Sequence, residues 1–225
     1  MLTLILALML TAAPTNGAGV TTTTTTRAAL ELLLSEVRDG FFPELAGLPL
    51  KTGTLPSSPG DRPNFFFQSN FDAGQGAAGT LALNIEINER IFDDPPSTLA
   101  LRAVLAHELA HSLDYQQRYA ADGARGLVAL LPMLFWDPVQ EEVERRADIV
   151  AVARGFGAGL LSYRVWLYAR IDAEAQRDKR RVYYAPLELA LLTTLLTRCP
   201  QVSADAIAHP PRSAREIVAL NPTCF

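Results

Sequence analysis

The sequence predicts an α+β protein that is mainly helical and carries a small antiparallel sheet. Two observations support this fold class. Beyond residue 98, long stretches lack Gly and Pro and repeat apolar residues at helical spacing. Before that point, residues 64–69 and 79–87 are aromatic or alternate large apolar residues with smaller ones, which is typical of strands. Because 49% of the 225 residues are hydrophobic, the chain can build one sizeable core.

The N-terminal end predicts export. Residues 1–18 contain an apolar run of signal-peptide length, which would direct the chain to the periplasm or outside the cell. The run is short for a membrane span and no basic residue precedes it, so cleavage and retention as an anchor both stay open. Residues 19–26 form a Thr-rich spacer. We therefore expect the folded domain to occupy residues 27–225 and to begin with a helix over 28–37.

A histidine pair in one pentapeptide carries the functional prediction. His107-Glu108-Leu109-Ala110-His111 lies in a helix expected from Thr98 to about Tyr119, after N-cap candidates at 94–97. Histidines at i and i+4 project from one helical face, so both can reach a single Zn²⁺. Glu108 lies about 100° around the helix, where it can act on a water beside the metal. This pattern predicts a zinc-dependent hydrolase.

A third ligand is expected on a second helix, over residues 139–154, which lacks helix breakers. Glu144 and Asp148 are separated by four residues and so share one face of that helix. The first carboxylate would bind the metal, and the second would accept the free N–H of a zinc-bound histidine. Glu141 lies one turn before Glu144 and stays open as the alternative ligand.

The remaining segments are expected to form core and connections. The apolar run 126–136 is interpreted as core or as the wall of a substrate cleft, with a loop that inserts into a membrane surface as the alternative. Further helices are expected at about 158–180 and 186–198. Residues 40–63 are rich in Pro and Gly and predict an irregular connection or short strands, and 72–79 predicts a turn.

Cys199 and Cys224 are the two cysteines of the chain. In an exported domain they would most simply form a disulfide. That bridge would tether the intervening segment, which contains His209. Two buried free thiols are the alternative.

Three segments together resemble the gluzincin metallopeptidases of the HtpX and CAAX-prenyl-protease type. These are the pentapeptide 107–111, the Glu-x-x-Ala-Asp segment 144–148, and the His-Pro-x-x-x-x-Arg segment 209–215, in that order. The resemblance implies a zincin-like domain in which an edge strand of the sheet borders the active-site cleft. The chain lacks the transmembrane helices obvious in many members, so the resemblance does not imply membrane substrates.

The resemblance also implies a role for each matching residue. His107, His111 and Glu144 would bind one Zn²⁺ per chain, with Asp148 behind them. Glu108 would be the general base and acid, while His209 and Arg215 would stabilise the tetrahedral intermediate. A second resemblance, to MtfA-type peptidases, would make Glu141 the third ligand. The metzincin pattern does not fit, because Asp114 and Gln117 stand where it requires Gly and then His or Asp.

These observations predict an exported zinc metalloendopeptidase that hydrolyses protein or peptide substrates with Glu108 as general base. The alternatives are a catalytically inactive zinc-binding chaperone or adaptor of the cell envelope, and a zinc hydrolase of a cell-wall amide. A net charge of −4, a pI of about 5.4 and scattered basic residues argue against nucleic-acid binding. Peripheral membrane contact through 126–136 stays open, and the sequence leaves the oligomeric state unknown.

Overall fold

The computed structural model describes residues 25–55, 65–72, 81–134 and 136–225. The predicted signal peptide, most of the spacer and the turn predicted over 72–79 therefore lie largely outside the described residues. The described part is mainly helical with one small sheet, which confirms the predicted fold class. Its helices and strands are α1 (Arg27–Phe41), β1 (Leu50–Thr54), β2 (Phe67–Asp72), β3 (Ala82–Ile87), α2 (Thr98–Asp122), α3 (Ala124–Val128), α4 (Asp137–Ala151), α5 (Gly157–Tyr168), α6 (Ala173–Val182), α7 (Pro186–Arg198), α8 (Ser203–Ala208) and α9 (Ala214–Leu220).

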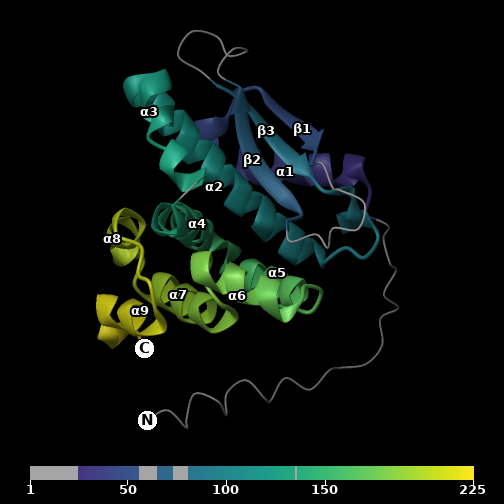
Figure 1. Ribbon diagram of the computed structural model, residues 1–225. Helices are drawn as coiled ribbons and strands as arrows, with labels where there is room; N and C mark the ends of the chain where they lie inside the picture. The colour runs from purple at the N-terminus through teal and green to yellow at the C-terminus, as the bar shows by residue number, and fades with distance from the viewer. Residues whose placement is uncertain (1–24, 56–64, 73–80, 135) are drawn as a thin grey trace.

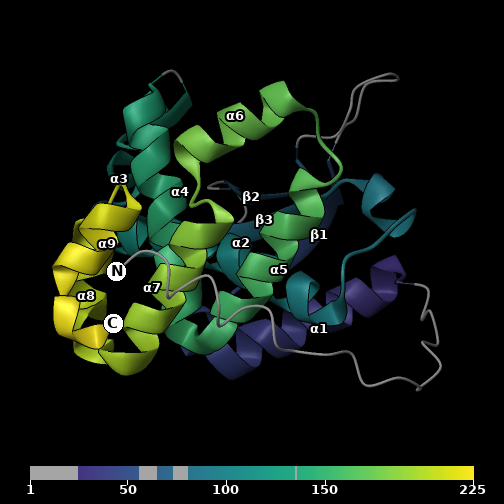
Figure 2. The same ribbon diagram turned by 90° about the horizontal axis from the view of Figure 1, so that it is seen from below.

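The long helix α2 runs through the middle of the molecule. The sheet lies on one side of it and the helices from α4 to α9 lie on the other (Figure 1). The elements α1, β2, α3, α4 and α5 pack directly on α2, and the view from below shows the same central position (Figure 2). The two layers therefore meet along the helix that carries the histidine pair.

The sequence sets both ends of α2. The Ser97 side chain accepts a hydrogen bond from the backbone N–H of Ala100, as an N-cap residue does. The helix ends at Gly123, whose φ of +59° lies in the region that favours glycine. Close packing against α5 depends on Gly159, because a Cβ there would lie 2.5 Å from the carbonyl oxygen of Leu99. The helix predicted from Thr98 is thus confirmed and extends slightly further than expected.

The sheet has the order β1-β3-β2 and is mixed. Strand β2 runs antiparallel to β3, as expected, with Ser69 opposite Ile85. Strand β1 pairs in parallel with β3, so the expectation of a wholly antiparallel sheet is corrected at this strand. Strand β3 lies in the middle of the sheet, between β1 and β2. Strand β2 runs in the opposite direction to both of its fellow strands, so β1 and β3 run in the same direction. Among the described strands β2 pairs with β3 alone, so its second edge faces away from the sheet.

In the second half of the chain, the helix predicted over 186–198 is confirmed as α7, whereas one of the other two predicted helices is divided. The helix expected over 139–154 is α4, which continues through a wider turn, Val152–Phe156, where Gly155 has a φ of +93°. The helix expected over 158–180 is divided into α5 and α6. The break occurs because Asp172 caps a new helix by accepting a hydrogen bond from the N–H of Ala175.

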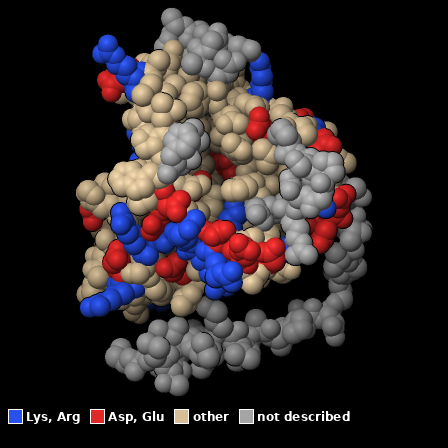
Figure 3. Space-filling view, viewed as in Figure 1, with Lys and Arg blue, Asp and Glu red and all other residues tan. Residues whose placement is uncertain are grey.

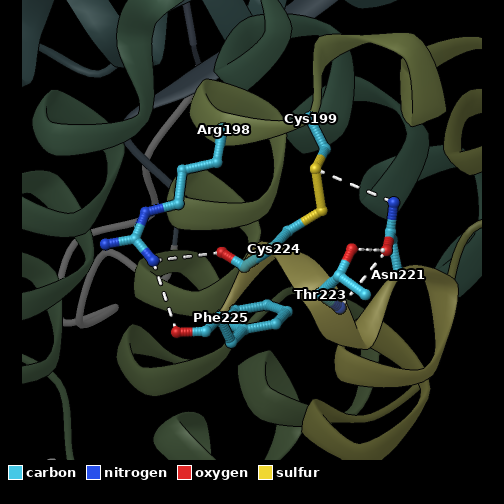
Figure 4. The surroundings of a disulfide bond; sticks show 6 residues. All are labelled: Arg198, Cys199, Asn221, Thr223, Cys224 and Phe225. Atoms are coloured by element: carbon cyan, nitrogen blue, oxygen red, sulfur yellow. Dashed lines mark hydrogen bonds between the residues drawn. A yellow bond between two sulfur atoms is a disulfide. The ribbon is translucent and has the colours of Figure 1, made fainter.

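The two cysteines form a disulfide, as predicted. The bridge joins the end of α7 to the C-terminal segment (Figure 4). The guanidinium of Arg198 lies alongside and donates hydrogen bonds to the carbonyl oxygens of Cys224 and Phe225. Among the described helices, none combines the length and apolar character that crossing a membrane requires.

Candidate metal centre

Three side chains from two helices converge at the junction of α2 and α4. The Nε2 atoms of His107 and His111 are 3.1 Å apart. One carboxylate oxygen of Glu144, Oε2, lies 3.1 Å from the first and 3.0 Å from the second. The three atoms therefore form a nearly equilateral triangle, and together they could hold a metal ion. The prediction that two imidazoles and one distant carboxylate meet at one point is confirmed in geometry.

The electrostatics of this cluster favour positive charge. Burial alone would lower the pKa of His107, but its hydrogen bonds with Asp148 and Glu144 outweigh burial and raise that pKa to about 10. Burial would raise the pKa of Glu144, yet the two histidines hold it well below its usual range. The imidazole of His107 therefore holds a proton strongly, and a metal cation at the same place would have to displace that proton.

Asp148 lies behind the cluster and joins three elements. Its Oδ1 is 2.8 Å from Nδ1 of His107, the contact predicted for a residue that supports a metal ligand. In the neutral imidazole, a proton on Nδ1 donated to Asp148 leaves the Nε2 lone pair of His107 available to a metal. Asp148 is fully buried, and both of its oxygens accept hydrogen bonds from Nη2 of Arg164 on α5, at 3.2 and 3.1 Å. Its Oδ2 also lies 3.4 Å from the backbone nitrogen of Tyr184.

Glu108 lies beside the metal-ligand triangle and faces a cleft. Its side chain is buried, and burial raises its pKa, an effect that the neighbouring histidines partly oppose. The backbone N–H of Ser69 on β2 donates a hydrogen bond to Glu108. This contact fixes the carboxylate between the helix and the edge strand. The position is that of a group able to accept a proton from a water at the metal.

The cleft has a volume of about 400 Å³ and is bordered by the edge strand β2. Figure 3 shows this face of the molecule hollowed, with acidic atoms visible among mainly uncharged side chains. One side of the cleft is the strand 67–71, and its floor includes Glu108, His111 and Glu144. Leu127, Leu130 and Leu131 also line the cleft and form an apolar part of its wall. Both the bordering edge strand and the role of residues 126–136 as a cleft wall are therefore as predicted.

Glu141 is not part of the metal-ligand triangle. Its Oε1 lies 3.3 Å from Nε of Arg145, one turn further along α4. The two residues line a separate groove of about 460 Å³, which shares no described lining residue with the cleft. Glu141 lies one turn before Glu144 on the same face of α4, so its ion pair with Arg145, and not its spacing, holds it away from the histidines. Among the described residues, the structure therefore brings Glu144, and not Glu141, to the histidine pair.

The structure places His209 and Arg215 away from the cleft, so their predicted role at the tetrahedral intermediate is corrected. His209 is exposed, ends α8 and lines the same separate groove as Glu141. Arg215 is exposed on α9. The physical reason is that the loop between α8 and α9 is anchored away from the cleft. There the carbonyl oxygen of Pro211 accepts hydrogen bonds from Arg145 at 3.2 Å and from the Tyr184 hydroxyl at 2.7 Å.

Sequence reasoning missed three side chains beside the site: Arg164, Lys179 and Tyr183. All three are buried, although two of them are basic. Burial lowers the pKa of Lys179 to about 7, and burial together with Glu144 raises the pKa of Tyr183 well above its usual range. Lys179 belongs to a charged run that reads as solvated surface, so the sequence holds no local signal for its burial. For Arg164 the sequence does offer a signal, because this residue is basic and lies within the otherwise mainly apolar stretch of α5.

No protein-family model, no curated protein and no solved structure matches the chain. The functional assignment therefore depends on the geometry of the site itself.

Proposed function

We propose that this protein is a zinc metallopeptidase in which His107, His111 and Glu144 bind the metal. The observation that carries the proposal is the triangle of two imidazole nitrogens and one carboxylate oxygen, with edges of 3.0–3.1 Å. A glutamate placed beside the triangle and open to a cleft adds the group that hydrolysis needs. The resemblance of the segments 107–111 and 144–148 to gluzincins supports the same assignment.

The donor set fits zinc. Two imidazoles and one carboxylate, with a position left for water or substrate, are a common ligand set of catalytic zinc. A circle through three atoms with these separations has a radius of about 1.8 Å, shorter than zinc–ligand bonds of about 2.0–2.1 Å. His107, His111 and Glu144 could therefore hold one zinc ion together. Without a metal, a proton on Nε2 of His107 would have to lie between the three atoms, and a metal cation would replace that proton.

Glu108 would move the proton in the reaction. Zinc in this site would lower the pKa of a water molecule toward 7 and polarise the substrate carbonyl. The carboxylate of Glu108 would accept the proton that this water loses as its oxygen attacks the peptide carbon. It would then donate the proton to the leaving amine as the C–N bond breaks. Its hydrogen bond from the Ser69 backbone holds it in position for both steps.

The edge of β2 would bind the backbone of the substrate. The N–H of Ser69 points to Glu108, and its carbonyl oxygen lies 3.5 Å from the hydroxyl of Tyr115 on α2. The backbone of Ser69 therefore faces the cleft instead of β3. Since alternate residues of a strand point the same way, Phe67 and Phe71 also direct their backbone groups to the cleft. An extended peptide could pair with them as an additional strand.

The leucine wall would bind an apolar side chain of that peptide. Leu127 and Leu130 are buried, and Leu131 continues the same wall with half of its surface exposed. The cleft is also lined by the aromatic rings of Phe71 and Tyr115, whose centroids are 5.1 Å apart. We propose unfolded proteins and extended peptides with large apolar residues as the substrate class. The disulfide and the apolar N-terminal run support our proposal that the protein is exported.

Cleavage of casein by the purified zinc-loaded protein tests this function. The variant Glu108→Gln is expected to keep its zinc and to lose at least about 100-fold in cleavage rate, because it removes the proton acceptor. Glu141→Gln on α4 is the matched control and should cleave like the wild type. Equal cleavage by Glu108→Gln and the wild type, or cleavage by neither, would refute the peptidase assignment.

A further inference from the structure

A peptidase site needs a hydrogen-bond donor for the oxygen that becomes negatively charged when water adds to the carbonyl. The sequence offered His209 for this role, but His209 lines a separate groove. A side chain that lines the cleft itself could supply the donor instead. The candidates are the hydroxyl groups of Ser69, Tyr115 and Tyr183 and the amides of Gln68, Asn70 and Gln140. Of these side chains, only the three that carry hydroxyl groups are buried.

Two of these hydroxyls are already engaged. The hydroxyl of Ser69 lies 2.8 Å from that of the buried Ser112. The hydroxyl of Tyr115 points to the carbonyl oxygen of Ser69. In contrast, no hydrogen bond within the described residues occupies the hydroxyl of Tyr183. A phenol has an ordinary pKa near 10, so at neutral pH this group carries a proton that it can share.

Tyr183 also lies close to the metal ligands. It lines the cleft together with Glu108, His111 and Glu144. Its ring centroid is 6.0 Å from that of His107. Its side chain comes from the junction between α6 and α7, whereas the metal ligands come from α2 and α4. The fold therefore brings a third segment of the chain to the edge of the same site.

The ring of Tyr183 is held in place by two buried basic side chains. The Cζ atom of Arg164 lies 4.6 Å from its centroid and the Nζ atom of Lys179 lies 4.9 Å from it. Arg164 in turn is paired with Asp148, which contacts His107. A phenol fixed in this way loses little freedom when it donates a hydrogen bond, which is the condition for efficient stabilisation of a transition state.

We propose that Tyr183 is a catalytic residue whose phenol donates a hydrogen bond to the anionic oxygen of the tetrahedral intermediate. This inference rests on the proposed function and identifies the donor that His209 does not supply. The phenol keeps its proton throughout, because the proton that moves in the reaction passes between water, Glu108 and the leaving amine. Arg164 and Lys179 are positioning residues that act through the ring.

The variant Tyr183→Phe tests the proposal by kinetics. It keeps the ring between the two basic side chains and removes the hydroxyl alone. We expect kcat for a peptide substrate to fall about 10²–10³-fold while KM changes little, because the donor acts in the transition state. Zinc content and thermal stability should stay at the wild-type level, a result that a merely structural role would not give. Tyr184→Phe is the matched control, since its hydroxyl bonds to Pro211 outside the cleft.

Binding of a phosphinic peptide to the zinc-loaded protein provides a second readout that needs no turnover. The tetrahedral phosphinate carries the anionic oxygen that Tyr183 would contact, so Tyr183→Phe should weaken binding about 10–100-fold. If the wild type leaves casein intact yet binds the phosphinate with this dependence, the peptidase assignment fails, and with it the catalytic role of Tyr183, whereas the hydrogen bond from its phenol to a tetrahedral anion stands. Wild-type rates and affinity in Tyr183→Phe would overturn the proposal. Failure of the wild type to cleave and to bind would overturn both.

Discussion

The substitution Asp148→Asn should weaken both the fold and the metal site. Asp148 is fully buried and holds His107, Arg164 and the backbone N–H of Tyr184 at once. Asparagine has nearly the same shape but no charge. It therefore leaves the guanidinium of Arg164, which is 3% exposed as a residue, without its counter-ion. In this variant the buried guanidinium of Arg164 keeps its neighbours but loses the negative charge that neutralises it.

The magnitude follows from the burial of this pair. Removing one partner of a buried ion pair costs about 3–5 kcal/mol. Because the amide oxygen of asparagine can still accept one hydrogen bond, we expect about 3 kcal/mol in the zinc-free protein. Loss of the carboxylate behind His107 should also weaken zinc binding about 10–100-fold. That factor adds about 1.4–2.7 kcal/mol to the destabilisation of the zinc-loaded protein.

Urea unfolding with and without zinc, together with zinc titration against a competing chelator, measures both effects. Glu142→Gln is the control on the same helix, because its ion pair with Arg146 lies at the surface and should contribute less than about 1 kcal/mol. If Asp148→Asn unfolded within about 1 kcal/mol of the wild type and bound zinc equally well, our description of Asp148 as the support of His107 would be wrong.

Three further predictions follow from the site and its surroundings. His209→Ala should cleave casein at the wild-type rate, and a loss of tenfold or more would restore this residue to the mechanism. Replacing Cys199 and Cys224 by serine should lower the free energy of unfolding by about 3.5 kcal/mol, the value that the loop-entropy relation gives for a separation of 25 residues. The activity should not change. Calorimetry measures the first effect, and the casein assay checks the second. In the zinc-free protein the raised pKa of His107, about 10, keeps its imidazole protonated at pH 8, whereas an ordinary histidine is neutral there. Zinc binding at pH 8 should thus release about two protons, one from His107 and one from the water whose pKa zinc lowers, measured by titration calorimetry in buffers of different ionisation enthalpy; release of about one proton or fewer would contradict the prediction.

Local patterns sufficed for the parts of the fold and site that lie within one helix. The cap at Ser97 and the glycine at 123 set the limits of α2, and the four-residue spacing of the histidines sets their common face. The same reasoning selected Glu144 and Asp148 as a pair. It did not separate Glu144 from Glu141, although the spacing of Glu141 and Arg145 offered an ion pair that would hold Glu141 away from the metal.

Contacts between distant segments could not be predicted in this way. The order of the three sequence segments does not say on which side of α4 the loop containing His209 lies. Its place is set by hydrogen bonds to Pro211 from Arg145 and Tyr184, residues that belong to two other elements. The parallel pairing of β1 with β3 is likewise a long-range choice. These features depend on packing that no short pattern encodes.

The zinc content of the purified protein, measured by elemental analysis, tests the central claim most directly. Our account predicts about one zinc per chain in the wild type and in Glu141→Ala, and a large loss of zinc in Glu144→Ala, because Glu144 alone of the two contacts both histidines. Retention of zinc by Glu144→Ala with loss from Glu141→Ala would contradict the ligand set and the mechanism built on it.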